Sequence, residues 1–222
     1  MKILAIDTAT ERCSVALLLD GRIIDRSEET PRGHADLILP MVDAALKEAG
    51  LRLQDLDGLA YGRGPGAFTG VRIAVGVAQG LAFGAQLPTV GISDLAAVAQ
   101  QVASPGDRVL VCMDARMGEV YWAQFERAAQ SALVTAVGPE RVDRPDAVTV
   151  GGGSTIFAGT GFGAYPQSLP HRSDAVIHAT ALPRAREIAL LAEPELRAGR
   201  GKPAADAEPV YLRDRVVFVK NQ

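Results

Sequence analysis

The chain has 222 residues, of which 48% are hydrophobic and 22% charged, and its formal net charge is −3 with a pI near 5.7. So much apolar sequence excludes a disordered chain, and the length favours two domains of about 110 residues each. The slightly acidic balance argues against a protein that binds nucleic acid mainly through a broad basic face.

The N-terminus and the cysteines indicate the compartment. The opening MKILAIDTAT reaches Asp7 after a short apolar run, so the apolar core of a signal peptide cannot form there. Cys13 and Cys112 lie in separate strand-like runs, which is typical of buried free thiols in a reducing compartment. We therefore expect a cytoplasmic protein whose cysteines form no disulfide or metal site.

Three strands and a helix open the chain. The second and third apolar runs are joined by Asp20-Gly21, which is a strong hairpin signal. Apolar residues then recur at helical spacing over 34–49, where Gly50 closes the helix and Pro40 should bend it.

A fourth strand, predicted at 56–62, leads into a glycine-rich loop and a helix at about 70–85. The loop residues singled out here are Gly64, Pro65, Gly66, Phe68, Thr69, Gly70 and Arg72. A P-loop would place lysine directly after its last glycine, whereas Val71 stands there. A relaxed dinucleotide fingerprint also matches, but it follows the fourth strand and lacks the acidic residue that would bind the ribose.

Two interpretations of the loop remain. With Thr69 or Gly70 as the cap, the start of the helix would point free N–H groups at an anion. Alternatively, Pro65 and Gly66 form a tight turn while Phe68 fills the core, which is the commoner arrangement.

The helix at 70–85 is apolar enough to raise the question of a membrane span, because no charged side chain occurs from Ile73 to Ser93. Gln79, Gln86, Pro88 and several glycines favour a buried helix of a globular protein instead. We therefore expect no membrane segment.

Glycines form a row on this helix. Gly76, Gly80 and Gly84 recur every four residues and line one face, at a cost of up to about 1 kcal/mol each relative to alanine. Such a row lets another backbone approach closely. The layer that covers it is either the helix at 34–49 or a partner subunit, and both remain open.

The second half repeats the opening theme. After a break at 104–106, residues 108–126 read as strand, aspartate, turn and strand, with Asp114 at the place of Asp7. Two similar lobes facing each other across a cleft would explain the repeat, and the alternative is a coincidence of two ordinary hairpins. A glycine-rich stretch with one or two short strands, a helix at about 182–198 and a tail complete the chain.

Few residues suggest chemistry. The histidines at 34, 171 and 178 have no paired spacing, so we expect no metal site. Asp7 and Asp114 could act as acid and base, but a carboxylate that ends a strand and accepts turn N–H groups is the commoner case. The sequence therefore predicts a cleft without catalytic residues.

Five segments carry a family resemblance: ILAIDTAT at the start, HADLILP at 34–40, GPGAFTGVRI at 64–73, DARMGEVYWAQF at 114–125 and EPVYLRD near the end. Together they resemble the TsaB (YeaZ-like) family of tRNA threonylcarbamoyladenosine biosynthesis proteins, within the glycoprotease-like superfamily. The resemblance implies an α/β, actin/Hsp70-like (ASKHA) fold that duplicates a ribonuclease H-like unit, with mixed sheets and flanking helices in both lobes. We place the lobes at 1–103 and 104–222.

The resemblance also implies a role. The family pairs with the catalytic TsaD-like paralogue and a TsaE-like ATPase, so that threonylcarbamoyl passes to the adenosine next to the anticodon of tRNA. TsaD carries a metal-binding histidine pair where this chain has Ser93 and Asp94, so a non-catalytic partner is implied, which meets tRNA only indirectly. The chain alone should require no cofactor, ATP or ADP at the partner interface remains open, and a homodimer is expected in isolation.

The interface implied by the resemblance uses the helices at 34–49 and 70–85. Its candidate residues are Leu37, Met41, Ala45, Ile73, Gly76, Val77, Gly80, Leu81 and Gly84. Most members have serine where this chain has Ala67, so a hydroxyl contact to a nucleotide is lost there. Two other functions compete: an ATP-binding phosphotransferase or ATPase, suggested by the cleft, Asp7 and the loop, and a peptidase, which lacks a nucleophile–base pair.

Overall fold

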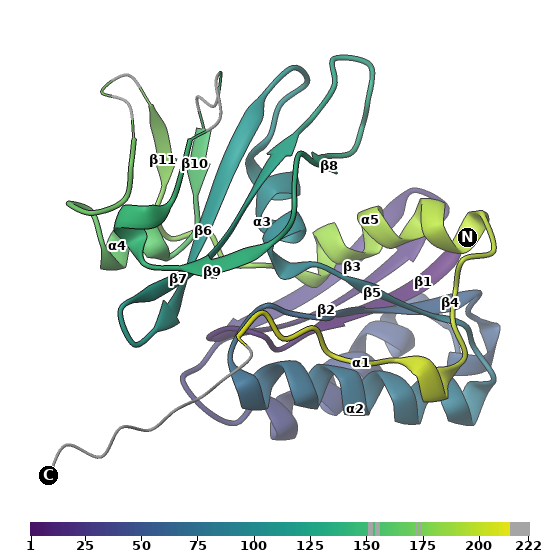
Figure 1. The fold of residues 1–222 in the computed structure, drawn as a ribbon. Helices are drawn as coiled ribbons and strands as arrows, with labels where there is room; N and C mark the ends of the chain where they lie inside the picture. Colours follow the sequence, from purple (N-terminus) through teal and green to yellow (C-terminus); the bar gives the residue numbers. More distant parts are fainter. Residues whose placement is uncertain (151–152, 154–155, 172, 174, 214–222) are drawn as a thin grey trace, which may run out of the picture.

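A computed structural model of the chain describes residues 1–150, 153, 156–171, 173 and 175–213. Two β-sheets form the centres of two lobes, with helices below the first sheet and between the two lobes (Figure 1). The tail beyond residue 213, and Ser154 in the glycine-rich stretch, lie outside the described residues.

The first sheet has five strands in the order β3-β2-β1-β4-β5. They are β1 (Lys2–Asp7), β2 (Arg12–Leu19), β3 (Arg22–Glu29), β4 (Gly58–Gly62) and β5 (Thr89–Ile92). The central strand β1 pairs antiparallel with β2 and parallel with β4. The predicted β2–β3 hairpin is confirmed, and its turn residues Asp20 and Gly21 have φ of 48° and 92°, as the tightest hairpin turns require.

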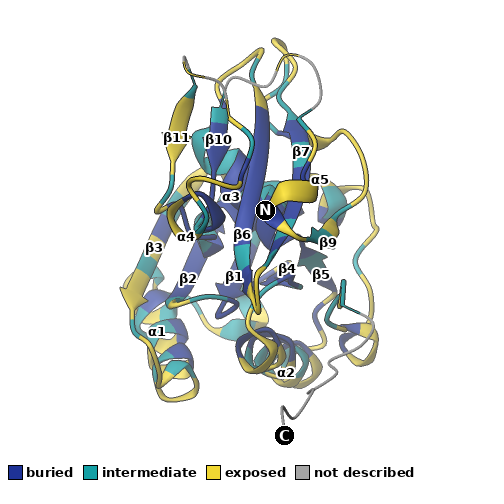
Figure 2. Cartoon of the chain, turned by 60° about the vertical axis from the view of Figure 1, so that its left-hand side comes forward, coloured by how far each residue is buried: buried dark blue, intermediate teal, exposed yellow. Residues whose placement is uncertain are grey.

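Both faces of this sheet are covered, because β1 alternates between two apolar sets. Leu4 and Ile6 pack with the helices α1 (His34–Ala49) and α2 (Phe68–Ala85). Ile3 and Ala5 point to the opposite face and pack with α5 (Ala185–Arg197). The interiors of both layers are buried, while the outer side of α2 is exposed (Figure 2).

The second sheet repeats the first. Its order is β11-β10-β6-β7-β8, with β9 also paired to β7. The strands are β6 (Arg108–Arg116), β7 (Glu119–Glu126), β8 (Thr135–Ala136), β9 (Arg141–Asp143), β10 (Ile156–Ala158) and β11 (Val176–His178). Central β6 pairs antiparallel with β7 and parallel with β10, as β1 does with β2 and β4. The predicted duplicated α/β fold is thus confirmed, and a coincidence of two hairpins does not explain the shared topology.

The lobes exchange helices. α3 (Asp94–Val102) follows the first sheet in sequence but packs on β6, β7 and β10 of the second. α5 follows the second sheet but packs on β1, β2, β4 and β5 of the first. The division into lobes at residue 103 stays a prediction, because α3, before it, packs on the second sheet and α5, after it, packs on the first.

Helix boundaries differ from the predicted ones only near their starts. α1 spans the predicted residues and ends at Gly50, whose φ of 65° is left-handed. α2 begins at Phe68 instead of Gly70, and α5 begins at Ala185 instead of 182. α2 has the length and mean hydropathy (1.3) of a membrane span, but its buried residues lie on the first sheet, so we interpret it as a packed helix of this fold.

Candidate functional site

The glycine-rich loop packs backbone to backbone on the turn after β1. A Cβ on Gly66 would lie 2.5 Å from the Ala9 carbonyl oxygen, and one on Gly70 would lie 2.0 Å from that of Thr8. The Ala67 N–H donates to the Ala9 carbonyl (2.7 Å), and the Thr8 hydroxyl donates to the Gly70 carbonyl (2.7 Å). Close packing inside the chain is therefore sufficient to explain these glycines.

The same contacts test whether the loop would hold a phosphate. Gly64, with a φ of 96°, donates its N–H to Asp94 Oδ2 at 2.6 Å, and the Ala67 N–H is already used. The buried carboxyl groups of Asp7 and Asp94 lie directly beside this loop. The Gly64 and Ala67 N–H groups are therefore not available to a phosphate, and the two acidic side chains beside the loop disfavour an anion there.

The start of α2 corrects two predictions. Its N-cap is Ala67, without a side-chain cap, and Thr69 and Gly70 lie inside the first turn. Phe68 does not fill the core but is 63% exposed, because the inward positions of the first turn belong to Gly70 and Val71. The Arg72 guanidinium lies 3.2 Å from the centre of the Phe68 ring. The centre of the Tyr211 ring, which belongs to the tail, lies 5.9 Å from the centre of the same Phe68 ring.

Five residues spaced four apart line the outward side of α2: Phe68, Arg72, Gly76, Gly80 and Gly84. We call them the glycine row. All five residues are exposed, and a Cβ on any of the three glycines would meet nothing within 4 Å. The interpretation that α1 covers the glycines is therefore wrong.

The other candidate interface residues lie at the rim of the first core. Leu37, Met41, Ile73, Val77 and Leu81 are partly buried and pack against it. Ala45 is fully buried, so its methyl group faces the sheet and is not available to a partner.

The two strand-ending aspartates form matching turns. Asp7 Oδ1 accepts the Ala9 N–H at 2.9 Å, and Asp114 Oδ1 accepts the Arg116 N–H at 2.8 Å. Each carboxylate thus caps the backbone two residues on, as the commoner interpretation holds. The equivalent turns also support the duplication.

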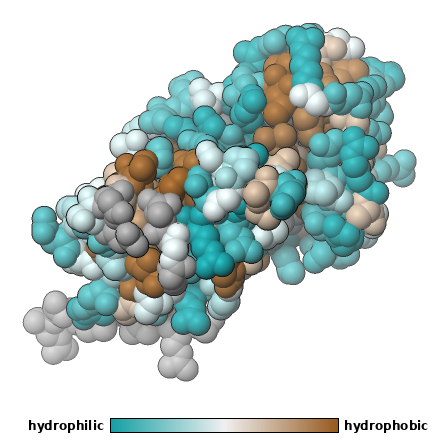
Figure 3. Space-filling view, turned by 90° about the horizontal axis from the view of Figure 1, so that it is seen from above, coloured by the Kyte–Doolittle hydropathy of each residue, from teal (hydrophilic) through white to brown (hydrophobic). Residues whose placement is uncertain are grey.

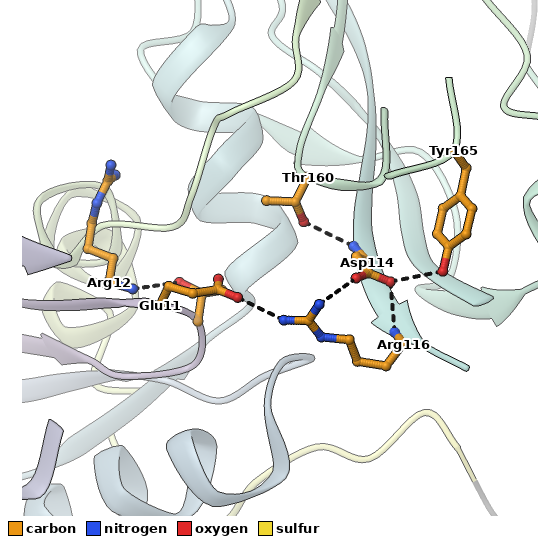
Figure 4. Close-up of polar contacts among 7 residues, drawn as sticks. Glu11, Arg12, Asp114, Arg116, Thr160 and Tyr165 are labelled. Atoms are coloured by element: carbon orange, nitrogen blue, oxygen red, sulfur yellow. Dashed lines mark hydrogen bonds and ion pairs between the residues drawn. The ribbon is translucent and has the colours of Figure 1, made fainter. Parts of the chain in front are cut away.

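An ion-pair network joins the two turns across the lobes (Figure 4). The Arg116 guanidinium contacts Asp114 at 3.1 Å and Glu11, in the turn after β1, at 2.9 Å. Tyr165 donates its hydroxyl to Asp114 at 3.1 Å, and the pKa of this hydroxyl is raised by burial and by the carboxylate. The Asp114 N–H donates to Thr160 Oγ1 at 3.0 Å.

Two further arginine–carboxylate contacts attach distant segments to side chains of the second lobe. Arg63, after β4, pairs with Glu140 at 3.0 Å, and Arg213, in the tail, pairs with Glu119 of β7. These contacts lie far apart in sequence, so no local pattern could have predicted them. The Arg63–Glu140 pair thus holds the segment after β4 against the second lobe.

The site offers little for metal chemistry. In the described part of the chain, no three His, Cys, Asp or Glu residues lie together as a metal would need. His34 begins α1 with a buried Nε2 that has no hydrogen-bond partner, while His171 and His178 are exposed in the second lobe.

The two sheets of equivalent topology define an α/β protein with a duplicated ribonuclease H-like (ASKHA) fold, and comparison with known proteins supports this class. Residues 26–220 match the model of the TsaD family, described as tRNA N6-adenosine threonylcarbamoyltransferase. Escherichia coli TsaB is 44% identical over 99% of this chain and 98% of its own length, and Haemophilus influenzae TsaB is 39% identical over 99% and 97%.

A solved structure agrees. YeaZ from Pseudomonas aeruginosa is 44% identical and superposes with a TM-score of 0.88, over 95% of this chain and 99% of that one. The chain belongs to the TsaB (YeaZ) family of tRNA threonylcarbamoyladenosine biosynthesis proteins.

Proposed function

We propose that this chain is the non-catalytic partner of a TsaD-like catalytic paralogue in threonylcarbamoyl transfer to the adenosine next to the anticodon of tRNA. The observation that carries the proposal is the glycine row. Three glycines on an exposed helix face reduce the stability of the chain without relieving any contact inside it. A partner backbone that packs closely against α2 would offset that cost.

The ends of the row suit such an interface. Phe68 with Arg72 at one end, and Phe83, 79% exposed, beside the other end, are residue types enriched at protein interfaces. α2 runs along the underside of the molecule in Figure 1, and the face seen from above is mostly hydrophilic with separate hydrophobic patches (Figure 3). In isolation, a second copy of the chain would use the same surface and form a homodimer.

The remaining assignments follow from this role. The strand-ending carboxylates serve turns and ion pairs, which supports a chain without catalysis of its own. ATP or ADP would be held jointly with the paralogue, since two N–H groups of the loop are already used within the chain, and the TsaE-like ATPase would join that complex. The chain would meet tRNA only through the complex and would act in the cytoplasm. The ATPase and peptidase alternatives find no support at the loop or the turns.

The test places a large side chain on the row. Gly80→Leu should abolish binding to the purified TsaD-like paralogue in gel filtration and remove threonylcarbamoyl transfer to tRNA in the reconstituted reaction, with the melting temperature retained. Gly138→Leu is the matched control, because Gly138 is also exposed with open space around it, but in the second lobe. Binding by Gly80→Leu equal to the control would refute the interface, and full transfer without the chain would refute the function.

A further inference from the structure

Two carboxyl groups meet in the buried space beside the glycine-rich loop. Asp7, at the end of β1, and Asp94, at the start of α3, are both 0% exposed. The two carboxyl groups lie next to each other, and each affects the ionisation of the other. Gly62 leaves them room, since a Cβ there would lie 2.5 Å from Asp7 Oδ1 and 2.6 Å from Asp94 Oδ1.

The hydrogen bonds of this pair require a proton. Asp7 Oδ1 accepts the Ala9 N–H and Asp94 Oδ2 accepts the Gly64 N–H. Among the residues that the structure describes, no group donates to the buried oxygens Asp7 Oδ2 and Asp94 Oδ1. If both groups were ionised, two adjacent charges would stand out of water without a donor, whereas one proton between them removes a charge and supplies the missing bond.

The surroundings do not neutralise two charges. His34 of α1 and Arg63 of the loop act on the pair only at a distance, and Arg63 is already paired with Glu140. The Cys13 thiol of β2 is neutral, because burial and nearby Asp7 raise its pKa to about 12. Burial likewise raises the pKa of Asp7 and, more strongly, of Asp94.

We propose that Asp94 is a positioning residue for the glycine-rich loop, and that it acts as a neutral acid by sharing one proton with Asp7 at neutral pH. Through the Gly64 N–H it holds the loop that leads into α2, and through Asp7 it ties this loop to the end of β1. Loss of the proton would leave two carboxylates that repel each other where the loop meets the end of β1. This inference concerns the isolated chain and does not depend on the proposed partner.

The proton can be observed directly. Infrared spectra of the wild-type protein at neutral pH should contain the C=O band of a protonated carboxyl, which shifts on labelling with 13C-aspartate and disappears in Asp94→Asn. Absence of that band from the wild-type protein would overturn the proposal.

Stability against pH provides the second readout. The folded pair binds one proton more than the unfolded chain at neutral pH, so rising pH favours unfolding. Relative to Asp94→Asn, the unfolding constant of the wild type should rise about tenfold per pH unit from mildly acidic to mildly alkaline solution. The exposed Asp36→Asn is the control: it keeps the Asp7–Asp94 pair, so its unfolding constant should rise with pH as that of the wild type does. A wild-type to Asp94→Asn ratio independent of pH would contradict the shared proton.

Positioning is tested by rescue. Asparagine can accept the Gly64 N–H and donate to Asp7, whereas Asp94→Ala can do neither. Hydrogen exchange at Gly64 should therefore stay slow in Asp94→Asn and become at least tenfold faster in Asp94→Ala. Equal protection of Gly64 in both variants would show that Asp94 does not hold the loop.

Discussion

Replacing all three exposed glycines of α2 by alanine tests the central structural claim. In the triple variant Gly76→Ala, Gly80→Ala and Gly84→Ala, each new methyl group enters open space, since nothing lies within 4 Å of its position. Each backbone is already helical, so no strained conformation is forced on alanine. We therefore expect the isolated chain to become more stable while its partner surface becomes worse.

The magnitude follows from helix propensity. Each exposed Gly→Ala exchange inside a helix is worth 0.8–1.0 kcal/mol, so the three together should add about 2–3 kcal/mol to the free energy of unfolding. For a chain of this length, that gain corresponds to a rise in melting temperature of about 5–10 °C. Binding to the paralogue should weaken at the same time, because methyl groups hold a facing backbone further away.

Urea denaturation at a concentration where gel filtration shows a monomer measures the first effect, and titration with the paralogue measures the second. Gly70→Ala is the contrasting variant, because its methyl group would lie 2.0 Å from the Thr8 carbonyl oxygen and should destabilise the fold. A triple variant that loses stability would show that the row is covered within the chain. Unchanged binding would show that no partner backbone approaches it.

Two further predictions concern the cysteines and the ion pair between the lobes. Cys13 and Cys112 are fully buried and burial raises the pKa of both thiols, so at mildly alkaline pH a thiol reagent should label them only as fast as the protein unfolds. Labelling before unfolding would contradict this burial. Glu11→Gln removes the negative charge that pairs with Arg116, but both side chains are at least half exposed, so urea denaturation should show a loss of no more than about 1 kcal/mol. A loss that is much larger, or one that does not shrink in high salt, would mean that the pair is shielded from solvent.

Local patterns were enough to predict the two hairpins and the helices α1, α2 and α5, whereas α3 and α4 were not predicted. Asp20-Gly21 specified a turn, and apolar spacing specified α1 and α2, because these features depend on neighbours in sequence. The glycine row was visible as well, but its exposure was not. Whether a helix face is covered depends on where the rest of the chain packs, and periodicity does not record this.

The features that were missed depend on residues far apart in sequence. Asp94 meets Asp7 only because α3 begins beside the end of β1, and Arg63 meets Glu140 only because the lobes close on each other. Phe68 looked like a core residue by its chemistry, yet it lies outside because Val71 takes the inward position. α5 was predicted as a helix, but its place on the first sheet was not.

The exchange of α3 and α5 has a consequence during synthesis. One face of the first sheet, with Ile3 and Ala5, is covered by residues 185–197. A ribosome that has made only the first half of the chain has therefore produced all strands of that sheet but not the helix that shields it. The nascent N-terminal lobe must carry a bare apolar face until most of the second lobe has been translated, and a chain terminated before α5 should be a target for chaperones and proteases.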